Sequence, residues 1–281
     1  MIRDSEIISI YQVDAFTDVP FKGNPAAICL ITKDYPDEIL QKIAAEMNLS
    51  ETAFIYIPYI DRIKETNTFR LRWFTPKVEV NLCGHATLAS ASVLFFEVGI
   101  NSDIVNFDTL SGRLSAKRIE KSIGLNFPLN NPEEITAPEA LIKAMKIKNC
   151  LATSYASGVT DILLEVKNED EVRNVNPDFG ELLNLKLDLE IRGVIVTSKG
   201  SGDVDFVSRF FAPWVGINED PVTGSAHTIL TPYWSKKLGK SEMKAEQLSE
   251  RSGKLNVRLL KDDRVEIIGK TTLVFKGELI I

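Results

Sequence analysis

The chain has few residues of the types that build metal sites, disulfide frameworks or nucleic-acid interfaces. Its 281 residues include only two histidines and three cysteines, and no C-x-x-C spacing occurs. An odd number of cysteines without that spacing indicates reduced thiols, which favours a cytoplasmic protein over a disulfide-bonded or zinc-knuckle protein. Acidic residues outnumber basic ones, 39 against 33, so we expect neither nucleic acid nor an acidic membrane as a partner.

Long hydrophobic runs are absent as well. The first residues, MIRDSEIISIYQV, contain no apolar stretch of the signal-peptide kind, and no run approaches the length of a transmembrane helix. The composition is nevertheless 44% hydrophobic and 26% charged, which is typical of a folded protein with a large core. The length is sufficient for two domains.

The best-known catalytic motifs are also missing. The sequence contains no G-x-S-x-G and no H-E-x-x-H, and no G-x-G-x-x-G follows an expected strand. The segment GKTT at 269–272 lacks the first glycine of a phosphate-binding loop. Two histidines without paired cysteines make a poor set of metal ligands. We therefore expect neither a metal nor a cofactor.

One pattern is present twice. The segment RWFTPKVEVN at 72–81 and the segment RFFAPWVGIN at 209–218 share Arg, Phe, Pro, Val and Asn at matching positions. Because the two segments lie almost half a chain apart, they predict two copies of one structural unit.

The similarity continues beyond these segments. CGHATLASASVLFFEVG at 83–99 and TGSAHTILTPYWSKKLG at 223–239 each carry a glycine and a histidine near the start and close on a glycine, which predicts two helices. The segments 111–127 and 252–268 each begin Ser-Gly-basic-Leu and then alternate, which predicts two β-hairpins. Between the halves, 129–150 is expected to form a polar loop and a short helix.

The predicted fold class is therefore α+β with two similar halves, residues 1–125 and 126–281. The C-terminal strand, TTLVFKGELII, is expected to return at least in part to the first half. Two related halves would set two similar helix starts against one interdomain cleft, where small-molecule sites tend to form.

Both histidines, His85 and His227, fall in the first turns of the matched helices, beside Gly84 and Gly224. A helix start offers unpaired N–H groups and the positive end of the helix dipole, which suit a carboxylate or a developing oxyanion. Either histidine could instead be only a capping or packing residue, and the sequence leaves both interpretations open.

Two carboxylates are further candidates. Asp220 is held extended by the proline that follows it and would lie across the second helix start, unless it only caps that helix. Glu51 precedes the apolar residues Ala53 and Phe54. It lies either at a solvent-exposed edge or in a buried position, where its pKa would be raised and suited to acid–base work.

Cys83 is an alternative candidate for the catalytic base, because the pKa of a thiol at a helix start is expected to fall. A two-thiol racemase would need a second cysteine at the matching place, where the second half has Asp220 and Thr223 instead. This difference argues against symmetric two-thiol racemisation, and it leaves a one-thiol epimerase as an alternative.

Four blocks together resemble one known family: VDAFTDVPFKGNPAAICL (13–30), NLSETAFI (48–55), FTPKVEVNLCGHATLASA (74–91) and EDPVTGSAH (219–227). They are similar to the hallmark blocks of the PhzF-like family, which includes the phenazine-biosynthesis isomerase, and QLSERSGKLNV (247–257) resembles its closing region. The resemblance spans nearly the whole chain. It implies a fold similar to diaminopimelate epimerase, with two pseudo-symmetric halves that each wrap a sheet around a central helix.

The resemblance also implies roles for individual residues. It puts the catalytic acid–base carboxylate on Glu51, a substrate-facing histidine on His85 and a second carboxylate on Asp220. Donors to a substrate carboxylate are implied at Gly84, Gly224 and Ser225, and a homodimer is the family expectation.

The activity implied is a cofactor-independent isomerase that moves a proton within a small carboxylate-bearing substrate. Besides the one-thiol epimerase, a non-catalytic small-molecule binding protein of the same fold is an alternative, although a binding protein has no need of a poised base.

Overall fold

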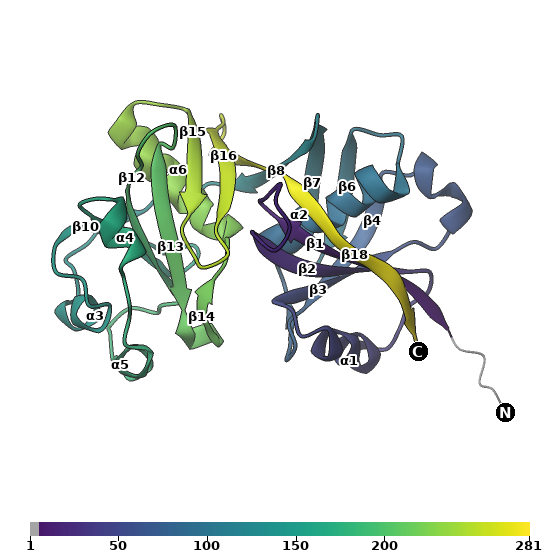
Figure 1. Cartoon of the computed structure of the whole chain (residues 1–281), viewed down its shortest axis with the longest axis horizontal. Coiled ribbons are helices and arrows are strands. Elements are labelled where there is room, and N and C mark those ends of the chain that lie inside the picture. Colours follow the sequence, from purple (N-terminus) through teal and green to yellow (C-terminus); the bar gives the residue numbers. More distant parts are fainter. Residues whose placement is uncertain (1–5) are drawn as a thin grey trace. The chain divides into compact units, whose positions relative to one another are not determined.

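The computed structural model describes residues 6–281, which form two compact units (Figure 1). The first unit contains the chain up to Asn126 together with Ile268–Ile281, and the second contains Phe127–Ile267. No helix among the described residues combines the length and apolar character needed to cross a membrane.

The first unit is a mixed sheet with two main helices. Its elements are β1 (Ile7–Ala15), β2 (Asn24–Ile31), α1 (Asp37–Met47), β3 (Glu51–Tyr56), the 3-10 helix η1 (Ile60–Glu65), β4 (Thr68–Phe74), β5 (Glu79–Val80), α2 (Gly84–Ser92), the π-helical continuation η2 (Val93–Val98), β6 (Ile104–Thr109), β7 (Gly112–Ile119), β8 (Ser122–Pro128) and β18 (Thr271–Ile280). The strands pair in the order β18–β1–β2–β3–β4–β6–β7–β8, with β2–β3 and β4–β6 parallel and the other pairs antiparallel.

The C-terminal strand lies beside the N-terminal one. β18 pairs with β1 along its whole length, from Ile7 opposite Ile280 to Ala15 opposite Thr271, as the yellow and purple strands of Figure 1 show. The last strand of the chain is thus part of the sheet of the first unit.

Helices cover both faces of this sheet. Side chains of β1 and β2 alternate between the faces, and one set packs with Leu40 and Ile43 of α1. The opposite face meets α2, which contacts β1, β2, β3, β7 and β18. β2 is therefore buried on both sides, which explains its nearly unbroken apolar sequence, NPAAICLI.

α2 is the central helix of the first unit. Every residue from His85 to Ser92 is buried, and most are small, so the surrounding strands approach closely. The helix continues through η2 and ends at Gly99, which has a left-handed φ of 72°. The helix predicted over 83–99 is confirmed, and so is the first hairpin, formed by β7 and β8.

The second unit repeats this plan. Its elements are β9 (Glu133–Glu134), α3 (Glu139–Ala144), β10 (Cys150–Ala156), β11 (Asp161–Val166), α4 (Glu169–Arg173), α5 (Phe179–Leu183), β12 (Gly193–Lys199), β13 (Phe206–Ala212), the 3-10 helix η3 (Pro213–Val215), β14 (Ile217–Asp220), α6 (Gly224–Leu238), β15 (Glu242–Gln247), β16 (Gly253–Leu259) and β17 (Arg264–Gly269). Its sheet follows β9–β10–β11–β12–β13–β15–β16, with β11–β12 and β13–β15 parallel.

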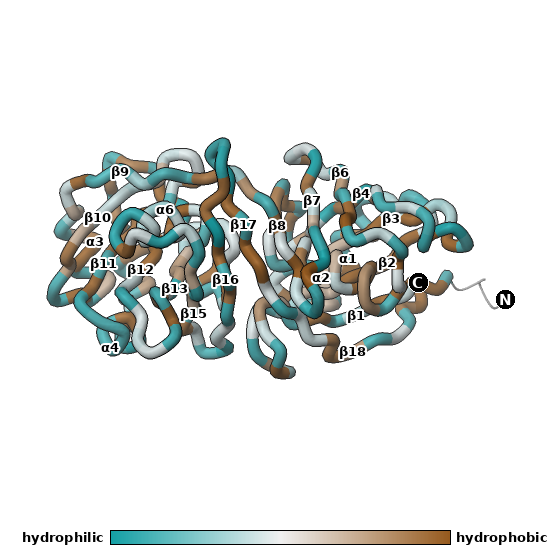
Figure 2. Tube along the Cα trace, turned by 90° about the horizontal axis from the view of Figure 1, so that it is seen from above, coloured by the Kyte–Doolittle hydropathy of each residue, from teal (hydrophilic) through white to brown (hydrophobic). Residues whose placement is uncertain are grey.

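Each pairing of the first unit from β1 to β7 has its counterpart in the second from β10 to β16. The repeat inferred from 72–81 and 209–218 is therefore a repeat of structure. α6 corresponds to α2, packs on β15 and β16, and ends at Gly239 with a φ of 66°, as the pattern at 223–239 predicts. Figure 2 shows hydrophobic stretches along the strands and hydrophilic ones at many of the turns.

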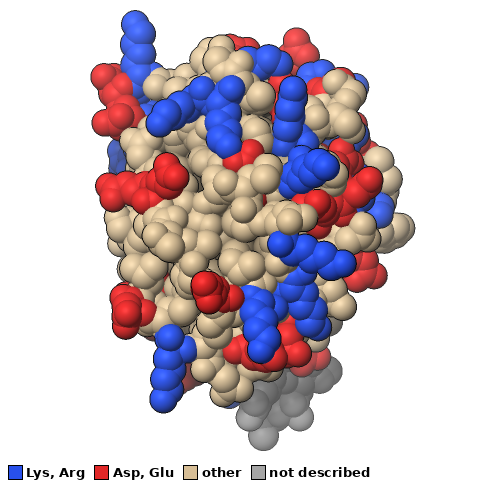
Figure 3. Space-filling view, turned by 90° about the vertical axis from the view of Figure 1, so that its left-hand side faces the viewer, with Lys and Arg blue, Asp and Glu red and all other residues tan. Residues whose placement is uncertain are grey.

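The surface carries charges of both signs. On the face of the second unit that Figure 3 shows, lysine and arginine side chains are interspersed with aspartate and glutamate.

Candidate active site

Glu51 is the first residue of β3, and the alternation of that strand decides where its side chain goes. Phe54 belongs to the apolar cluster on the α1 face. Because neighbouring residues of a strand point to opposite faces, Glu51, Ala53 and Ile55 point to the face covered by α2. Glu51 is only 8% exposed, so the buried alternative holds and the solvent-edge alternative is wrong.

The start of α2 brings two more polar side chains to Glu51. Cys83 is the residue before the helix, Gly84 is its first residue and His85 its second. His85 Nε2 lies 3.2 Å from Glu51 Oε2, and His85 Nδ1 lies 3.5 Å from Cys83 Sγ. The imidazole thus stands between a thiol and a carboxylate, and all three side chains are buried.

The contact between Glu51 and His85 is close but is not a well-aligned hydrogen bond. Glu51 Oε2 and His85 Nε2 are both buried without a hydrogen-bond partner among the described residues, although they lie 3.2 Å apart. The attraction is therefore mainly electrostatic, and both atoms keep hydrogen-bonding capacity for another group.

The protonation of this pair differs from the sequence-based expectation. Burial raises the pKa of Glu51, but the charge and hydrogen-bonding capacity of His85 outweigh burial and hold the pKa below its ordinary value. Burial lowers the pKa of His85, yet Cys83 and Glu51 together raise it well above 6.5. At neutral pH we therefore assign a carboxylate to Glu51 and an imidazolium to His85. The raised pKa predicted for a buried Glu51 is wrong, because a cation lies next to it.

Cys83 also departs from expectation. Burial and the nearby Glu51 raise the pKa of its thiol to about 11, against the weaker opposing effects of His85 and the backbone of Ala86. The predicted fall at the helix start is wrong, because the thiol is buried and lies close to a carboxylate. At neutral pH the thiol is protonated, so Glu51 is the charged partner of His85.

In the second unit, the turn before α6 is built around Asp220. Its carboxylate accepts a hydrogen bond from the hydroxyl of Thr223, the residue that precedes the helix. The side chain of Gln247 accepts from the N–H of Thr223 at 2.9 Å and donates to the carbonyl of Asp220 at 2.8 Å. Asp220 is thus fixed at the helix start, together with Gly224 and Ser225.

An arginine lies against the same helix start. Arg192 donates from Nε and Nη2 to the two carboxylate oxygens of Asp161, with 3.0 Å from Nε to Oδ1, and from Nη2 to Ser225 Oγ at 3.0 Å. Asp161 is fully buried, whereas the Arg192 side chain is one-third exposed. The guanidinium also lies 5.4 Å from the ring centroid of Phe210. A buried carboxylate therefore fixes a partly exposed cation beside Ser225.

The strand registers show how the two units differ at this place. Phe74 and Phe211 occupy matching positions in the repeat. Phe74 pairs with Thr52, and Phe211 pairs with Val194, so Thr52 and Val194 also match. The residue before each of them is Glu51 in the first unit and Gly193 in the second. A Cβ on Gly193 would come within 2.3 Å of the ring of Phe210, so any larger residue there would force the ring to move. Where the first unit has a carboxylate, the second has a glycine that follows Arg192.

His227 differs from His85 in its surroundings. It is fully buried, its Nδ1 lies 2.8 Å from the carbonyl of Thr223, and burial lowers its pKa to about 4. It is therefore neutral at neutral pH, and the packing interpretation fits it. The two histidines therefore differ in protonation, and the one to which the resemblance assigned the substrate-facing role, His85, is the one next to Glu51.

One cluster could hold a metal ion. Glu51, Cys83 and His85 each offer a ligand atom, and the three atoms lie within 4.8 Å of one another. The thiol, imidazole and carboxylate are the ligand types that zinc takes. From the sequence, the histidines and cysteines alone were a poor set of metal ligands. The structure adds the carboxylate of Glu51 to Cys83 and His85.

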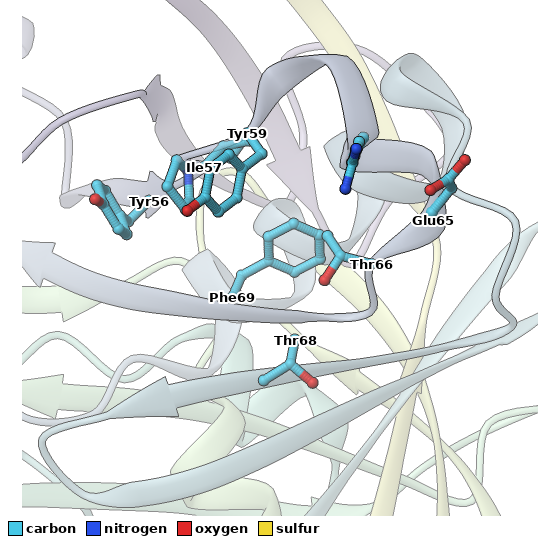
Figure 4. Close-up of a pocket in the computed structure, with 9 residues that line it drawn as sticks. Tyr56, Ile57, Tyr59, Glu65, Thr66, Thr68 and Phe69 are labelled. Atoms are coloured by element: carbon cyan, nitrogen blue, oxygen red, sulfur yellow. The ribbon is translucent and has the colours of Figure 1, made fainter.

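A separate pocket of about 300 Å³ lies at the other end of β3. The aromatic rings of Tyr56, Tyr59 and Phe69 border it, together with Thr68 (Figure 4). Tyr56 ends the strand that Glu51 begins, roughly 17 Å away along an extended strand. This pocket is distinct from the acid–base cluster.

Three residues of the second unit were not predicted from the sequence: Asp161, Arg192 and Gln247. A signal existed for the first two: Asp161 opens the apolar strand DILLEV as Glu51 opens ETAFIY, and Arg192 precedes the apolar strand GVIVTSK. Gln247 opens the block at 247–257, but the sequence did not show its role, which depends on parallel pairing between β13 and β15.

Comparison with known proteins agrees with this architecture. The sequence profile of the phenazine biosynthesis-like proteins, PhzC-PhzF, matches residues 13–277. An uncharacterised isomerase of Pseudomonas aeruginosa is 46% identical over 97% of this chain and 98% of its own. A human phenazine biosynthesis-like domain-containing protein is 44% identical over 97% and 99% of the two chains.

Solved structures agree as well. A PhzF family protein of Enterococcus faecalis is 41% identical and superimposes with a TM-score of 0.90, covering 98% of this chain and 100% of its own. A hydroxyproline epimerase of Agrobacterium vitis, 11% identical with a TM-score of 0.57 and covering 99% of this chain and 92% of its own, shares the fold alone. The fold is thus the α+β fold of the diaminopimelate epimerase type. Taken together, the repeat, the fold and the matches along nearly the whole sequence show that this chain belongs to the PhzC-PhzF family of phenazine biosynthesis-like proteins.

Proposed function

We propose that the protein is an isomerase that moves a proton between carbons of a small carboxylate-bearing substrate, with Glu51 as the acid–base group and without a cofactor. One observation carries this proposal: Glu51 is a buried carboxylate held ionised by the imidazolium of His85 at the start of a helix. The names of the relatives as isomerases support the reaction class.

The chemistry follows from the charges. Glu51 accepts a proton from a carbon next to a conjugated or carbonyl-activated system, becomes neutral, and returns the proton to another carbon. Negative charge moves meanwhile from Glu51 to the substrate, where His85 and the N–H groups at the start of α2, near Gly84, stabilise it. The imidazolium compensates for the low basicity of Glu51, because it favours the delocalised anion as that anion forms.

We assign the substrate carboxylate to the second unit. The N–H groups at Gly224 and Ser225, the hydroxyl of Ser225 and the guanidinium of Arg192 are donors close to one another at the start of α6. Asp220 keeps the preceding turn in place and orients polar groups of the substrate. We propose that both helix starts act on one substrate molecule. A homodimer and a cytoplasmic location are also part of this proposal.

The proposal is tested by solvent exchange with cyclohexa-2,5-diene-1-carboxylate, whose ring C–H is next to both double bonds and the carboxylate. In deuterated buffer the protein is expected to incorporate deuterium into the ring and to form the conjugated diene, followed by NMR and near-ultraviolet absorption. Ring exchange no faster than in protein-free buffer, for this acid and for ring-substituted analogues, would count against the proposal.

A one-thiol epimerase is the second candidate, because the Cys83 thiol lies 3.5 Å from His85. The two candidates differ in what Cys83→Ser does. A thiol base would lose at least about 1,000-fold in rate with serine in its place, whereas the Glu51 mechanism predicts a change of only a few fold. The measurement is deuterium incorporation into the diene acid and into the α-carbon of L-proline, before and after treatment with a thiol alkylator. Alkylation-sensitive exchange at proline that Cys83→Ser abolishes would favour the epimerase.

A further inference from the structure

The cluster of Glu51, Cys83 and His85 has the composition of a three-ligand metal site with an open position. Its ligand atoms lie within 4.8 Å of one another, and all three side chains are buried. Glu51 Oε2 is buried without a hydrogen-bond partner among the described residues, and so is His85 Nε2, the imidazole nitrogen that faces it. Buried polar atoms of this kind are costly unless another group binds them.

The spacing between thiol and imidazole suits a tetrahedral ion. In a tetrahedral zinc site, a sulfur ligand lies about 2.3 Å and a nitrogen ligand about 2.0 Å from the ion. At the tetrahedral angle these two ligand atoms are about 3.5 Å apart. Cys83 Sγ and His85 Nδ1 are 3.5 Å apart. These two residues are separated by one glycine at the start of α2, so the helix fixes their spacing.

Glu51 supplies the third ligand once its side chain has rotated. In the structure its carboxylate faces Nε2, whereas the thiol faces Nδ1. Ligand atoms of the three residues lie within 4.8 Å of one another, and the site requires the carboxylate to turn towards the ion held by Cys83 and His85. A site with three protein ligands leaves the fourth position to solvent or to a substrate carboxylate.

We propose that Glu51, Cys83 and His85 bind a thiophilic divalent cation, Zn²⁺ in the first place, and that the bound ion reversibly inhibits the enzyme. On binding, the ion displaces the thiol proton of Cys83 and the imidazolium proton of His85, and both are released to solvent. Inhibition rests on the proposed function, because an ion on the Glu51 carboxylate occupies the lone pairs that would accept the substrate proton. Binding itself does not depend on that function.

Co²⁺ tests the site without any substrate, because it takes the place of zinc and reports its ligands by absorption. When the metal-free protein is titrated with Co²⁺, absorption is expected to rise until one equivalent has bound. The bound ion should show visible d–d bands with the intensity of tetrahedral coordination and a near-ultraviolet thiolate-to-cobalt charge-transfer band. Zn²⁺ is expected to remove both. In Cys83→Ser the thiolate band is expected to vanish and the Zn²⁺ affinity to fall more than about 100-fold, which exceeds the loss from an outer-shell partner.

Cys150→Ser is the matched control, because Cys150 is a free cysteine of the second unit, outside this cluster. It should keep the thiolate band and the Zn²⁺ affinity of the wild type. Glu51→Gln should keep the thiolate band but weaken binding. A wild-type spectrum without a thiolate band, or a band that survives Cys83→Ser, would overturn the metal site. Loss of solvent exchange on adding Zn²⁺ tests inhibition separately, so a failed isomerase proposal would leave the binding result intact.

Discussion

Replacing Glu51 with glutamine is expected to abolish deuterium incorporation into the diene acid, with a loss of at least about 1,000-fold in rate. Glutamine has nearly the same shape but no basic lone pair of comparable strength, and general base catalysis typically contributes 10²- to 10⁴-fold. The neighbouring His85 also loses its counter-ion, so its pKa should fall and its stabilisation of the anion should weaken. The rate is measured by NMR under single-turnover conditions.

Glu165→Gln is the matched control for this variant. Glu165 is a glutamate of the second unit that is also 8% exposed, and it contacts Tyr233 and Lys237. The same chemical change is made there at the same degree of burial, so the control should exchange at close to the wild-type rate. Circular dichroism checks that both variants are folded. Wild-type exchange in folded Glu51→Gln would remove Glu51 from the mechanism and would favour the binding-protein or thiol alternatives.

Replacing Arg192 with methionine is expected to weaken the binding of a carboxylate at the start of α6 by about 100-fold. An arginine–carboxylate hydrogen bond is charge-assisted, and its loss typically costs about 1.5–3 kcal/mol, or roughly 10- to 150-fold. Benzoate serves as the probe, and the amide signals of Gly224 and Ser225 report its binding in NMR titrations. Benzamide has the same ring without the charge, so its weaker binding should not respond to the substitution.

Two further variants separate binding from folding. Arg192→Met leaves Asp161 buried without its cation, which destabilises the second unit, so the double variant Asp161→Asn/Arg192→Met removes both charges. It should fold better than the single variant and bind benzoate equally weakly. Arg258→Met removes a paired arginine of comparable exposure on β16 and should bind as the wild type does. Unchanged benzoate affinity in Arg192→Met, or no response of the Ser225 amide in the wild type, would exclude Arg192 as the carboxylate receptor.

The fold was largely predictable because the chain repeats itself. The matched segments at 72–81 and 209–218 fixed the equivalence of the halves, and the glycines at 99 and 239 marked both helix ends. We expected the C-terminal strand to return at least in part to the first half, but its partner strand, β1, could not be predicted, because a pairing between distant strands leaves no local pattern.

The candidate site was only partly predictable. The sequence left open whether Glu51 is buried or exposed, and its protonation depends on His85, which is distant in sequence and whose charge the sequence does not show. The same limit explains why the pKa of Cys83 was predicted to fall and instead lies near 11. Arg192 was missed because its importance comes from the buried partner Asp161 on the adjacent strand.

The two histidines make one measurement decisive. His85 has a raised pKa, so its contribution to stability is full below about 6.5, the unfolded value, and is lost as pH rises through its folded pKa. Glu51 has a lowered pKa, so its contribution is present above about 4.5 and is lost as pH falls through its folded pKa. The ion pair therefore spans neutral pH. His227, with a pKa of about 4, destabilises the fold as pH falls from 6.5 towards 4.

An NMR titration of the protein labelled with ¹⁵N in its histidine side chains shows both imidazoles directly. The charge pair of Glu51 and His85 predicts one histidine still protonated well above pH 6.5 and one neutral down to about pH 4. It also predicts that Glu51→Gln lowers the high value and leaves the low one unchanged. Two histidines that both titrate near pH 6.5, or a high value that Glu51→Gln does not move, would contradict the account.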